Sequence, residues 1–307
     1  MKPAFSVILF SSASGAGLGL AVWLLAWQLA GGVDAGDRAF WFAAVLSAAL
    51  FTVGLLSSTR HLANPRNAWR AFARLRTSWL SREGVLAVLV YPVAALHLWL
   101  SWVGAPAARL TAAALIALAM GVVLCTGMIY ACLKTIPRWR SWHVPVGYLL
   151  FALASGLLLW LAVAERPVVR PAMVQVSAGV RIATALMLAC AALKAAYWLK
   201  FAQPGGLSLA DALGFPKARV RLLDAGHTGA TFLTREFGFA LARGRARLLK
   251  GWALALMLPV PLSLLWLLPD AHWLAALTFF AGVLLERWLF FAEAQHVVRL
   301  VHGQQRV

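Results

Sequence analysis

Long apolar stretches separated by shorter polar ones dominate the pattern of this 307-residue chain. A helix needs about 20 apolar residues to cross the hydrocarbon core of a bilayer, so each stretch predicts one transmembrane helix. Eight stretches qualify, at residues 5–30, 39–58, 84–104, 110–133, 144–163, 174–198, 251–268 and 273–297. The pattern therefore predicts an all-α, polytopic membrane protein, in which a bundle of eight transmembrane helices forms one domain over residues 1–307.

Two of these stretches contain residues that affect helix packing or shape. In the first, Gly15 and Gly19 are four residues apart and offer a small-residue face for a close helix neighbour. The seventh is the shortest and contains Pro259 and Pro261, so we expect it to be kinked.

Composition supports the membrane assignment. Hydrophobic residues make up 62% of the chain and charged residues 12%, and the mean hydropathy is +0.79. A soluble domain of this length could not bury so much apolar surface. A net charge of +18 would suggest a nucleic-acid partner in a soluble protein. In a membrane protein, loop lysines and arginines fix the orientation instead, so we expect no nucleic acid.

The basic residues are distributed very unequally between the two sides of the predicted bundle. Eight crossings place both termini on the same side as the loops after helices two, four and six, which contain six, three and nine Lys or Arg residues. The opposite loops contain four, namely Arg38, Arg109, Arg166 and Arg170. The positive-inside rule therefore predicts that both termini and the large loops face the cytoplasm.

The loop between helices six and seven contains an amphipathic sequence. In TFLTREFGFALARGRARLLKGW, residues 231–252, apolar positions alternate with Arg235, Arg243, Arg245 and Arg247. This pattern predicts an amphipathic helix that lies on the membrane surface or is covered by a partner with an acidic face. Together with Arg66, Arg70 and Arg74 of the loop between helices two and three, these arginines are candidates for a docking surface.

The loop between helices two and three is flanked by two ionisable residues, His61 and Glu83. His61 could cap the carbonyl groups at the end of helix two, and the negative charge of Glu83 could interact favourably with the dipole at the start of helix three. Alternatively, an imidazole and a carboxylate at one membrane depth could exchange protons with a redox lipid, because reducing a quinone by two electrons consumes two protons. Trp79, Arg76 and Tyr91 complete this candidate quinone site.

The last predicted helix contains Glu286, Arg287, Glu293 and His296 in the sequence ERWLFFAEAQH. Glu293 and His296 are three residues apart and can meet on one helix face. Ionisable residues inside a membrane are costly and commonly functional. Glu286, Glu293 and His296 could form a proton relay, or the group could be an ion-pair network that holds the helices together.

Metal ligands are not evident in the pattern. Cys125, Cys132 and Cys190 lie in apolar segments without paired spacing, so we expect no iron–sulfur cluster or other metal site in this chain. His97 lies near the middle of predicted helix three, where it could bond a neighbouring helix or ligate haem. No second histidine at matching depth is evident, so haem b is not expected. No nucleotide-binding or hydrolase motif occurs, and we assign no catalytic residue for substrate chemistry.

Four stretches give the chain a specific resemblance: HLANPRNAWRAFARLRTSWLSREG at 61–84, MIYACLKTIPRW at 128–139, TFLTREFGF at 231–239 and ERWLFFAEAQHVVRLVHG at 286–303. They resemble the membrane-anchor subunit of the dimethyl sulfoxide reductase family of bacterial molybdenum oxidoreductases. The resemblance implies an inner-membrane subunit that docks an iron–sulfur subunit, which in turn contacts a molybdopterin catalytic subunit. It also implies bound ubiquinone or menaquinone, with His61 and Glu83 matching the family's quinone-site residues.

The charge pattern departs from one part of that family. Members with exported catalytic subunits dock them on the outer face, whereas the arginine-rich loops here are predicted to face inward. The chain is similar in this respect to anchors of cytoplasm-facing, sulfite-oxidising complexes. Two other functions stay open: a small-solute or ion transporter that uses Glu286, Arg287 and Glu293, and a haem-b cytochrome anchor.

Overall fold

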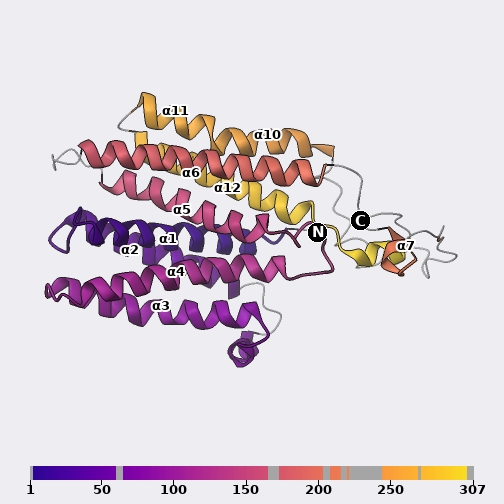
Figure 1. Ribbon diagram of the computed structural model, residues 1–307, viewed down its shortest axis with the longest axis horizontal. Coiled ribbons are helices and arrows are strands. Elements are labelled where there is room, and N and C mark those ends of the chain that lie inside the picture. The colour runs from indigo at the N-terminus through magenta and orange to yellow at the C-terminus, as the bar shows by residue number, and fades with distance from the viewer. Residues whose placement is uncertain are drawn as a thin grey trace.

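The computed structural model describes residues 3–59, 65–164, 173–202, 208–215, 220, 244–268 and 271–302. These residues form a bundle of long, nearly parallel and antiparallel helices (Figure 1). In chain order the helices are α1 (Phe5–Leu29), α2 (Arg38–Thr59), η1 (Pro65–Arg74), α3 (Trp79–Trp102), α4 (Ala108–Ala131), α5 (His143–Ala164), α6 (Met173–Lys200), α7 (Leu209–Ala212), α10 (Ala246–Met257), α11 (Pro259–Leu267), α12 (His272–Ala292) and η3 (Val297–His302).

Eight helical spans in the described residues are long and apolar enough to cross a membrane, which confirms the predicted fold class. The seventh span consists of two helices, α10 and α11. They break at Leu258, whose backbone angles of −131° and −76° are not helical, directly before Pro259. A proline ring clashes with the preceding turn and removes a backbone donor, so the predicted kink is confirmed.

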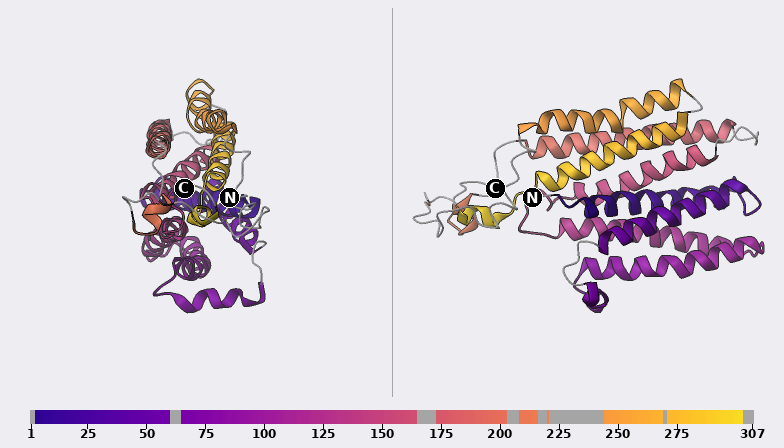
Figure 2. Two further views of the ribbon diagram at one scale, coloured as in Figure 1. Left: turned by 90° about the vertical axis from the view of Figure 1, so that its right-hand side faces the viewer. Right: turned by 180° about the vertical axis from the view of Figure 1, so that it is seen from behind.

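One end of the bundle collects most of the described cationic side chains. The start of α1 lies at this end with η1, α7 and η3 (Figures 1 and 2). We call it the basic end, because its described loops and helix ends contain Arg70, Arg74, Arg76, Arg82, Lys134, Arg138, Arg140, Lys200, Arg245, Arg247 and Lys250. At the opposite end, the described residues include Arg38 and Arg109.

The predicted amphipathic helix at 231–252 is only partly within the described residues. Its residues 231–243 lie outside them, including Arg235 and Arg243. From Ala246 onward the same sequence belongs to α10, so Arg247 and Leu248 form the first turns of the seventh span. The span therefore begins five residues earlier than the apolar pattern indicated, because long basic side chains can reach the aqueous boundary from within a helix.

Helix α1 occupies the centre of the bundle and packs against α2, α4 and α5. Its contact with α5 is made by backbone: a Cβ atom on Gly19 would lie 1.8 Å from the Ala152 carbonyl oxygen, and one on Gly156 would lie 2.0 Å from the Gly19 carbonyl carbon. Gly15 faces the same residue, Ala152, but a Cβ there would meet it at 3.8 Å. The predicted small-residue face is thus the α1–α5 interface.

Gly19 and Gly15 give the first testable prediction. Gly19→Ala should lower the thermal unfolding temperature of the detergent-solubilised protein, because forcing apart two close-packed helices costs about 1–3 kcal/mol. Gly15→Ala is the matched control, since its methyl group makes an ordinary van der Waals contact. The unfolding temperatures are measured by tryptophan fluorescence. Equal temperatures for the two variants would contradict this account of the interface.

Candidate functional site

The η1 segment is amphipathic. It lies at the basic end next to α3 and runs roughly perpendicular to the long helices of the bundle (Figure 2). The apolar residues Trp69, Phe72 and Leu75 are three positions apart. A helix with three residues per turn therefore places Trp69 and Phe72 on one face, and Leu75 comes directly after the end of the helix. Their side chains are 65%, 42% and 45% exposed. Arg70 and Arg74 are also exposed. This combination suits the membrane–water boundary, where aromatic rings and basic groups gather.

This amphipathic segment is not among the elements predicted from the sequence. The sequence analysis assigns amphipathic character to residues 231–252 and treats residues 60–83 as a basic loop. The three-residue spacing of Trp69, Phe72 and Leu75 is the signal that could have found it. Amphipathic α-helices also place apolar residues three or four positions apart, so a search for helical periodicity applied to this loop could have found the segment.

The corner between η1 and α3 is fixed by hydrogen bonds. Ser78 caps α3, its hydroxyl accepting from the Ser81 amide at 3.3 Å. The Ser81 hydroxyl accepts from the Arg74 amide at 3.2 Å, which ties the end of η1 to the first turn of α3. Phe72 lies against Gly84, where a Cβ atom would approach its ring to 3.1 Å.

Arg82 links two of the predicted site residues to this corner. Its guanidinium donates to the carbonyl oxygens of Leu75 at 2.9 Å and Arg76 at 2.8 Å. It also lies 4.2 Å from the ring centroid of Trp79. Arg76 and Trp79 are therefore part of one rigid turn, with the Arg76 side chain exposed.

Glu83 is buried within α3 rather than placed at its end. The helix begins at Trp79, five residues earlier than predicted, and the described first turn contains no acidic residue. Glu83 is 4% exposed, and the Thr126 hydroxyl of α4 donates a hydrogen bond to its Oε1. No described cation forms an ion pair with it. It does not act as a first-turn carboxylate, because Ser78 supplies the cap.

The other predicted quinone-site residues lie apart from Glu83 or outside the described residues. His61 falls in the undescribed segment 60–64, two residues after α2 ends. Tyr91 lies eight residues beyond Glu83, about 12 Å along the helix. Its ring stacks on Phe51 at 5.5 Å and its hydroxyl lies 2.9 Å from the Thr52 hydroxyl of α2.

A buried ion cluster lies at the same depth on other helices. The Glu286 carboxylate forms an ion pair with Lys194 Nζ at 2.5 Å and accepts a hydrogen bond from Arg287 Nε at 2.5 Å. All three residues are at most 4% exposed. The Arg287 guanidinium also lies over the Tyr148 ring at 4.4 Å. Two cations and one anion leave this cluster with one excess positive charge.

Glu83, Tyr148, Lys194 and Arg287 each lie four to six residues from the basic end of their helices. At 1.5 Å per residue, this places them about 6–9 Å inside the bundle. We call this set, with Thr126 and Glu286, the polar layer. It brings predicted residues from α3 and α12 together with Thr126, Tyr148 and Lys194, to which the sequence assigned no site role.

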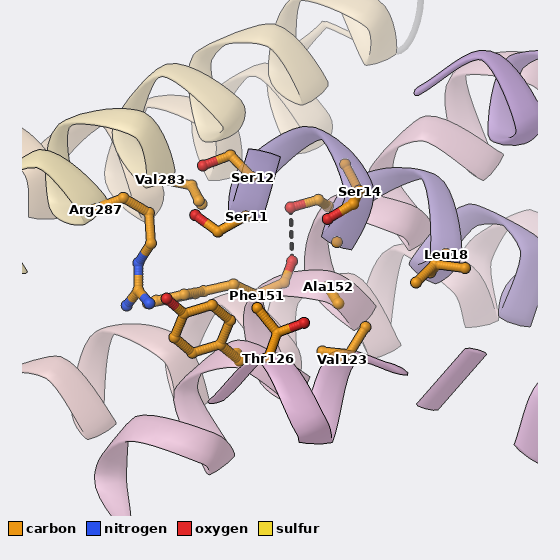
Figure 3. A pocket seen from close by; sticks show the side chains of 14 residues that line it. Ser11, Ser12, Ser14, Leu18, Val123, Thr126, Phe151, Ala152, Val283 and Arg287 are labelled. Atoms are coloured by element: carbon orange, nitrogen blue, oxygen red, sulfur yellow. Dashed lines mark hydrogen bonds between the residues drawn. The ribbon is translucent and has the colours of Figure 1, made fainter. Parts of the chain in front are cut away.

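A small cavity of about 20 Å³ lies in the polar layer, between α1, α4, α5 and α12 (Figure 3). Hydroxyl groups and the Arg287 guanidinium form its polar lining. The polar residues that line it are Ser11, Ser12, Ser14, Thr126, Tyr148, Ser155 and Arg287. Thr126 lies between this cavity and Glu83, because the residue lines the cavity and its hydroxyl donates to the Glu83 carboxyl group.

Glu293 belongs to a second ion cluster, closer to the basic end. It pairs with Arg138 at 3.2 Å and Lys250 at 2.7 Å. His296 follows α12, and its Nδ1 accepts from the Val298 amide at 3.1 Å. Burial lowers the pKa of the His296 imidazole below its ordinary value. Glu286 and Glu293 thus have different cationic partners, and their role as a relay stays a prediction.

His97 lies toward the opposite end of α3, five residues before Trp102, rather than near the middle. It is 1% exposed, and its ring nitrogens lie 3.0 Å from the Thr111 hydroxyl and 3.0 Å from Gln28 Oε1. An axial haem ligand at this position would have to give up one of these hydrogen bonds. His97 also lines an apolar cavity of about 90 Å³ between α1, α2, α3 and α4.

Among the described residues, no three His, Cys, Asp or Glu side chains are grouped so that they could hold a metal ion. The stretches 128–139 and 286–303 pack against each other at the basic end. The Trp139 indole stacks on Phe290 at 5.3 Å and donates to its carbonyl oxygen at 3.2 Å, and Tyr130 contacts Phe291 at 5.4 Å. Two of the stretches that carry the resemblance, 128–139 and 286–303, are therefore spatial neighbours.

Comparison with known proteins agrees with this picture. The family model described as DMSO reductase anchor subunit (DmsC) matches residues 1–292. The chain is also 33% identical, over an alignment of 328 residues, to the C subunit of the sulfite dehydrogenase of Allochromatium vinosum. That alignment covers 98% of this chain and 99% of its relative. A match over nearly the whole chain shows that this protein belongs to the DMSO reductase anchor subunit family.

Proposed function

We propose that this membrane-anchor subunit passes electrons between a docked iron–sulfur subunit and the quinone pool, at a site next to Glu83. The observation that carries the proposal is the Glu83 carboxyl group, which is buried at the basic end with a hydroxyl partner and no described ion-pair partner. A buried carboxyl without a countercharge is a suitable group to gain and lose a proton.

Quinone chemistry requires such a group. When a quinone accepts two electrons, each carbonyl oxygen must gain a proton, and quinol oxidation returns both. Glu83 can exchange one of them, and His61, at the other end of the same connection, is the candidate for the second. The chain itself supplies no redox centre in this proposal. The electrons would come from or go to the partner's iron–sulfur clusters, which contact a molybdopterin catalytic subunit.

The partner subunits would dock on the basic end. Arg70, Arg74, Arg140, Arg245 and Arg247 are exposed there, and η1 presents apolar side chains beside them. Such a surface suits a partner with an acidic rim and an apolar centre. By the positive-inside rule this face would be cytoplasmic in a bacterial inner membrane. Because the Allochromatium vinosum relative is a subunit of a sulfite dehydrogenase, sulfite is the substrate to test for the catalytic subunit.

The central experiment replaces Glu83 in the intact complex. Glu83→Gln and His61→Ala should each reduce quinone-coupled sulfite oxidation by about 10²-fold or more, because general acid–base groups contribute about 10²–10⁴-fold. Sulfite oxidation with a soluble dye should be retained, since the dye bypasses the membrane site. Normal quinone turnover in Glu83→Gln would refute the site, and loss of the bound partner subunits would make Glu83 structural.

A charge-reversal experiment tests the docking face. Changing Arg243, Arg245 and Arg247 to Glu should release the soluble partners from membranes at moderate salt, because like charges would then face an acidic surface. Changing Arg38 and Arg109 to Glu is the control at the opposite end of the bundle. Equal retention of the partners by both variants, measured by sedimentation of membranes, would contradict docking on the basic end.

Cysteine labelling tests the orientation. With Cys132 changed to Ser, Thr77→Cys and Ala107→Cys place exposed thiols at opposite ends of the bundle, since Cys125 and Cys190 are buried. A membrane-impermeant maleimide added to intact cells should label the Ala107→Cys variant and not the Thr77→Cys variant. The reverse labelling would place the basic end outside and remove the main argument for a cytoplasmic sulfite-oxidising complex.

A further inference from the structure

The apolar cavity beside His97 is separate from the polar layer. It has a volume of about 90 Å³ and lies between α1, α2, α3 and α4. On α3 its lining extends from Val90 to Leu98, which is about 12 Å along the helix axis. So small a volume over that length describes a narrow space parallel to the helices, with the shape of a chain rather than of a ring.

Every polar side chain in the lining of the apolar cavity already has a partner among the described residues. These side chains belong to Ser47, Tyr91 and His97. The Ser47 hydroxyl donates to the Gly17 carbonyl oxygen at 2.8 Å, and the Tyr91 hydroxyl bonds the Thr52 hydroxyl at 2.9 Å. Both ring nitrogens of His97 are also bonded. Cavities that offer only apolar contacts stay dry and bind apolar molecules, so the fitting occupant is a hydrocarbon.

The apolar cavity reaches the lipid-facing surface between α2 and α3. Two of its lining residues, Ala48 of α2 and Tyr91 of α3, are exposed. Small residues in a membrane helix usually allow a neighbouring helix to approach closely. Here Ala44 and Ala48 of α2 and Ala94 of α3 line the cavity, yet α2 and α3 are not packed together as closely as α1 and α2 or α3 and α4. The small side chains therefore leave space that a chain from the bilayer can enter.

Aromatic side chains close this space toward the end of the bundle opposite the basic end. The Trp41 ring of α2 meets the Trp102 ring of α3 edge-on, with centroids 5.9 Å apart. Both residues lie near the ends of their helices, whereas Ala48 and Tyr91 lie about 15 Å further in. A chain anchored at the opposite membrane surface would have to pass this contact, so entry is easier from the side of the basic end.

One face of α3 leads from Glu83 to the apolar cavity. Glu83, Ala87 and Val90 are four and three residues apart, so they share a face of the helix, and all three are buried. Val90 lies about 10 Å beyond Glu83 along the axis, away from the basic end. A quinone ring beside Glu83 would direct its tail toward the bilayer centre, and the tail would there be level with the cavity.

We propose that the apolar cavity binds the isoprenoid tail of the quinone, which enters between α2 and α3 past Ala48 and Tyr91. This proposal rests on the proposed quinone function and adds the place where the tail is held. The tail is already surrounded by hydrocarbon in the bilayer, so binding releases no water from it. The gain comes from dispersion contacts in a space that the helices themselves leave unfilled.

Photolabelling of the intact complex in phospholipid nanodiscs tests the site. The probes are two quinone analogues, one with a ubiquinone ring and one with a menaquinone ring, each with a diazirine in the middle of its isoprenoid tail. Mass spectrometry of peptides should find the label within residues 44–51 and 90–98, which contain the α2 and α3 lining. An excess of the matching unlabelled quinone should remove it. Absence of label from both segments with both probes would overturn the proposal.

Matched variants test whether the cavity itself holds the tail. Ala94→Leu fills the apolar cavity, whereas Ala95→Leu makes the same change at the next residue, which is exposed and is not part of the lining. The yield of label should fall about 10-fold in Ala94→Leu, as expected when a chain must enter an overfilled space, and should be unchanged in Ala95→Leu. Equal yields would contradict the proposal. If Ala94→Leu does not fold, Ala48→Leu and its exposed neighbour Ala49→Leu decide the question in the same way.

A third probe distinguishes the quinone tail from a phospholipid chain, because both are hydrocarbons. Phosphatidylglycerol with a diazirine in its acyl chain is incorporated into the same nanodiscs. Displacement of its label from the apolar cavity by unlabelled quinone would support the proposal. Label that excess quinone does not reduce would make the cavity an acyl-chain site and would overturn it.

The readouts separate this proposal from the proposed function, because photolabelling does not require turnover. An unlabelled cavity, together with loss of quinone-coupled oxidation in Glu83→Gln, would overturn the tail site and leave the redox site standing. Cavity labelling that Ala94→Leu abolishes would support the tail site even if Glu83→Gln turned over normally. In that case only the role of Glu83 would fall.

Discussion

The hydrocarbon core of a bilayer offers no hydrogen-bond partners, so every polar group within the spans must find its partner inside the protein. The polar side chains of this chain follow that constraint closely. His97 bonds both Gln28 and Thr111 near the opposite end, and Ser11 and Ser14 bond their own helix. Glu286 lies between Lys194 and Arg287. The bundle is therefore organised around internal polar contacts as much as around apolar packing.

The same constraint makes the exception informative. Glu83 is a buried carboxyl group without a described countercharge. It lies in the polar layer close to the basic end, where protons can arrive from water over a short distance. A rigid anchor made only for attachment would gain stability from pairing this group fully. Its incomplete pairing, next to a cavity, is the feature that an exchange of protons would require.

The close packing of α1 serves this arrangement. Because Gly19 and Gly156 allow α1 and α5 to touch through their backbones, the serines of α1 come close enough to line a cavity with α4, α5 and α12. On the other side of the layer, the η1–α3 corner holds the start of α3 through Ser78, Ser81 and Arg82. Glu83 is thereby placed between a rigid interfacial turn and a polar interior.

The sequence alone determined the eight spans, the kink before Pro259 and the concentration of basic residues at one end, because membrane insertion depends on apolar length and loop charge, which are local properties. It also singled out Glu83 and Glu286. Only the tertiary structure decided that Thr126 bonds Glu83, that Lys194 pairs with Glu286, and that Tyr148 lies beside them in the polar layer. Nothing in the local pattern marks a threonine or a serine in an apolar helix as a partner of a distant carboxyl group. Such partnerships depend on helix rotation and depth, which are set by packing between segments far apart in the chain.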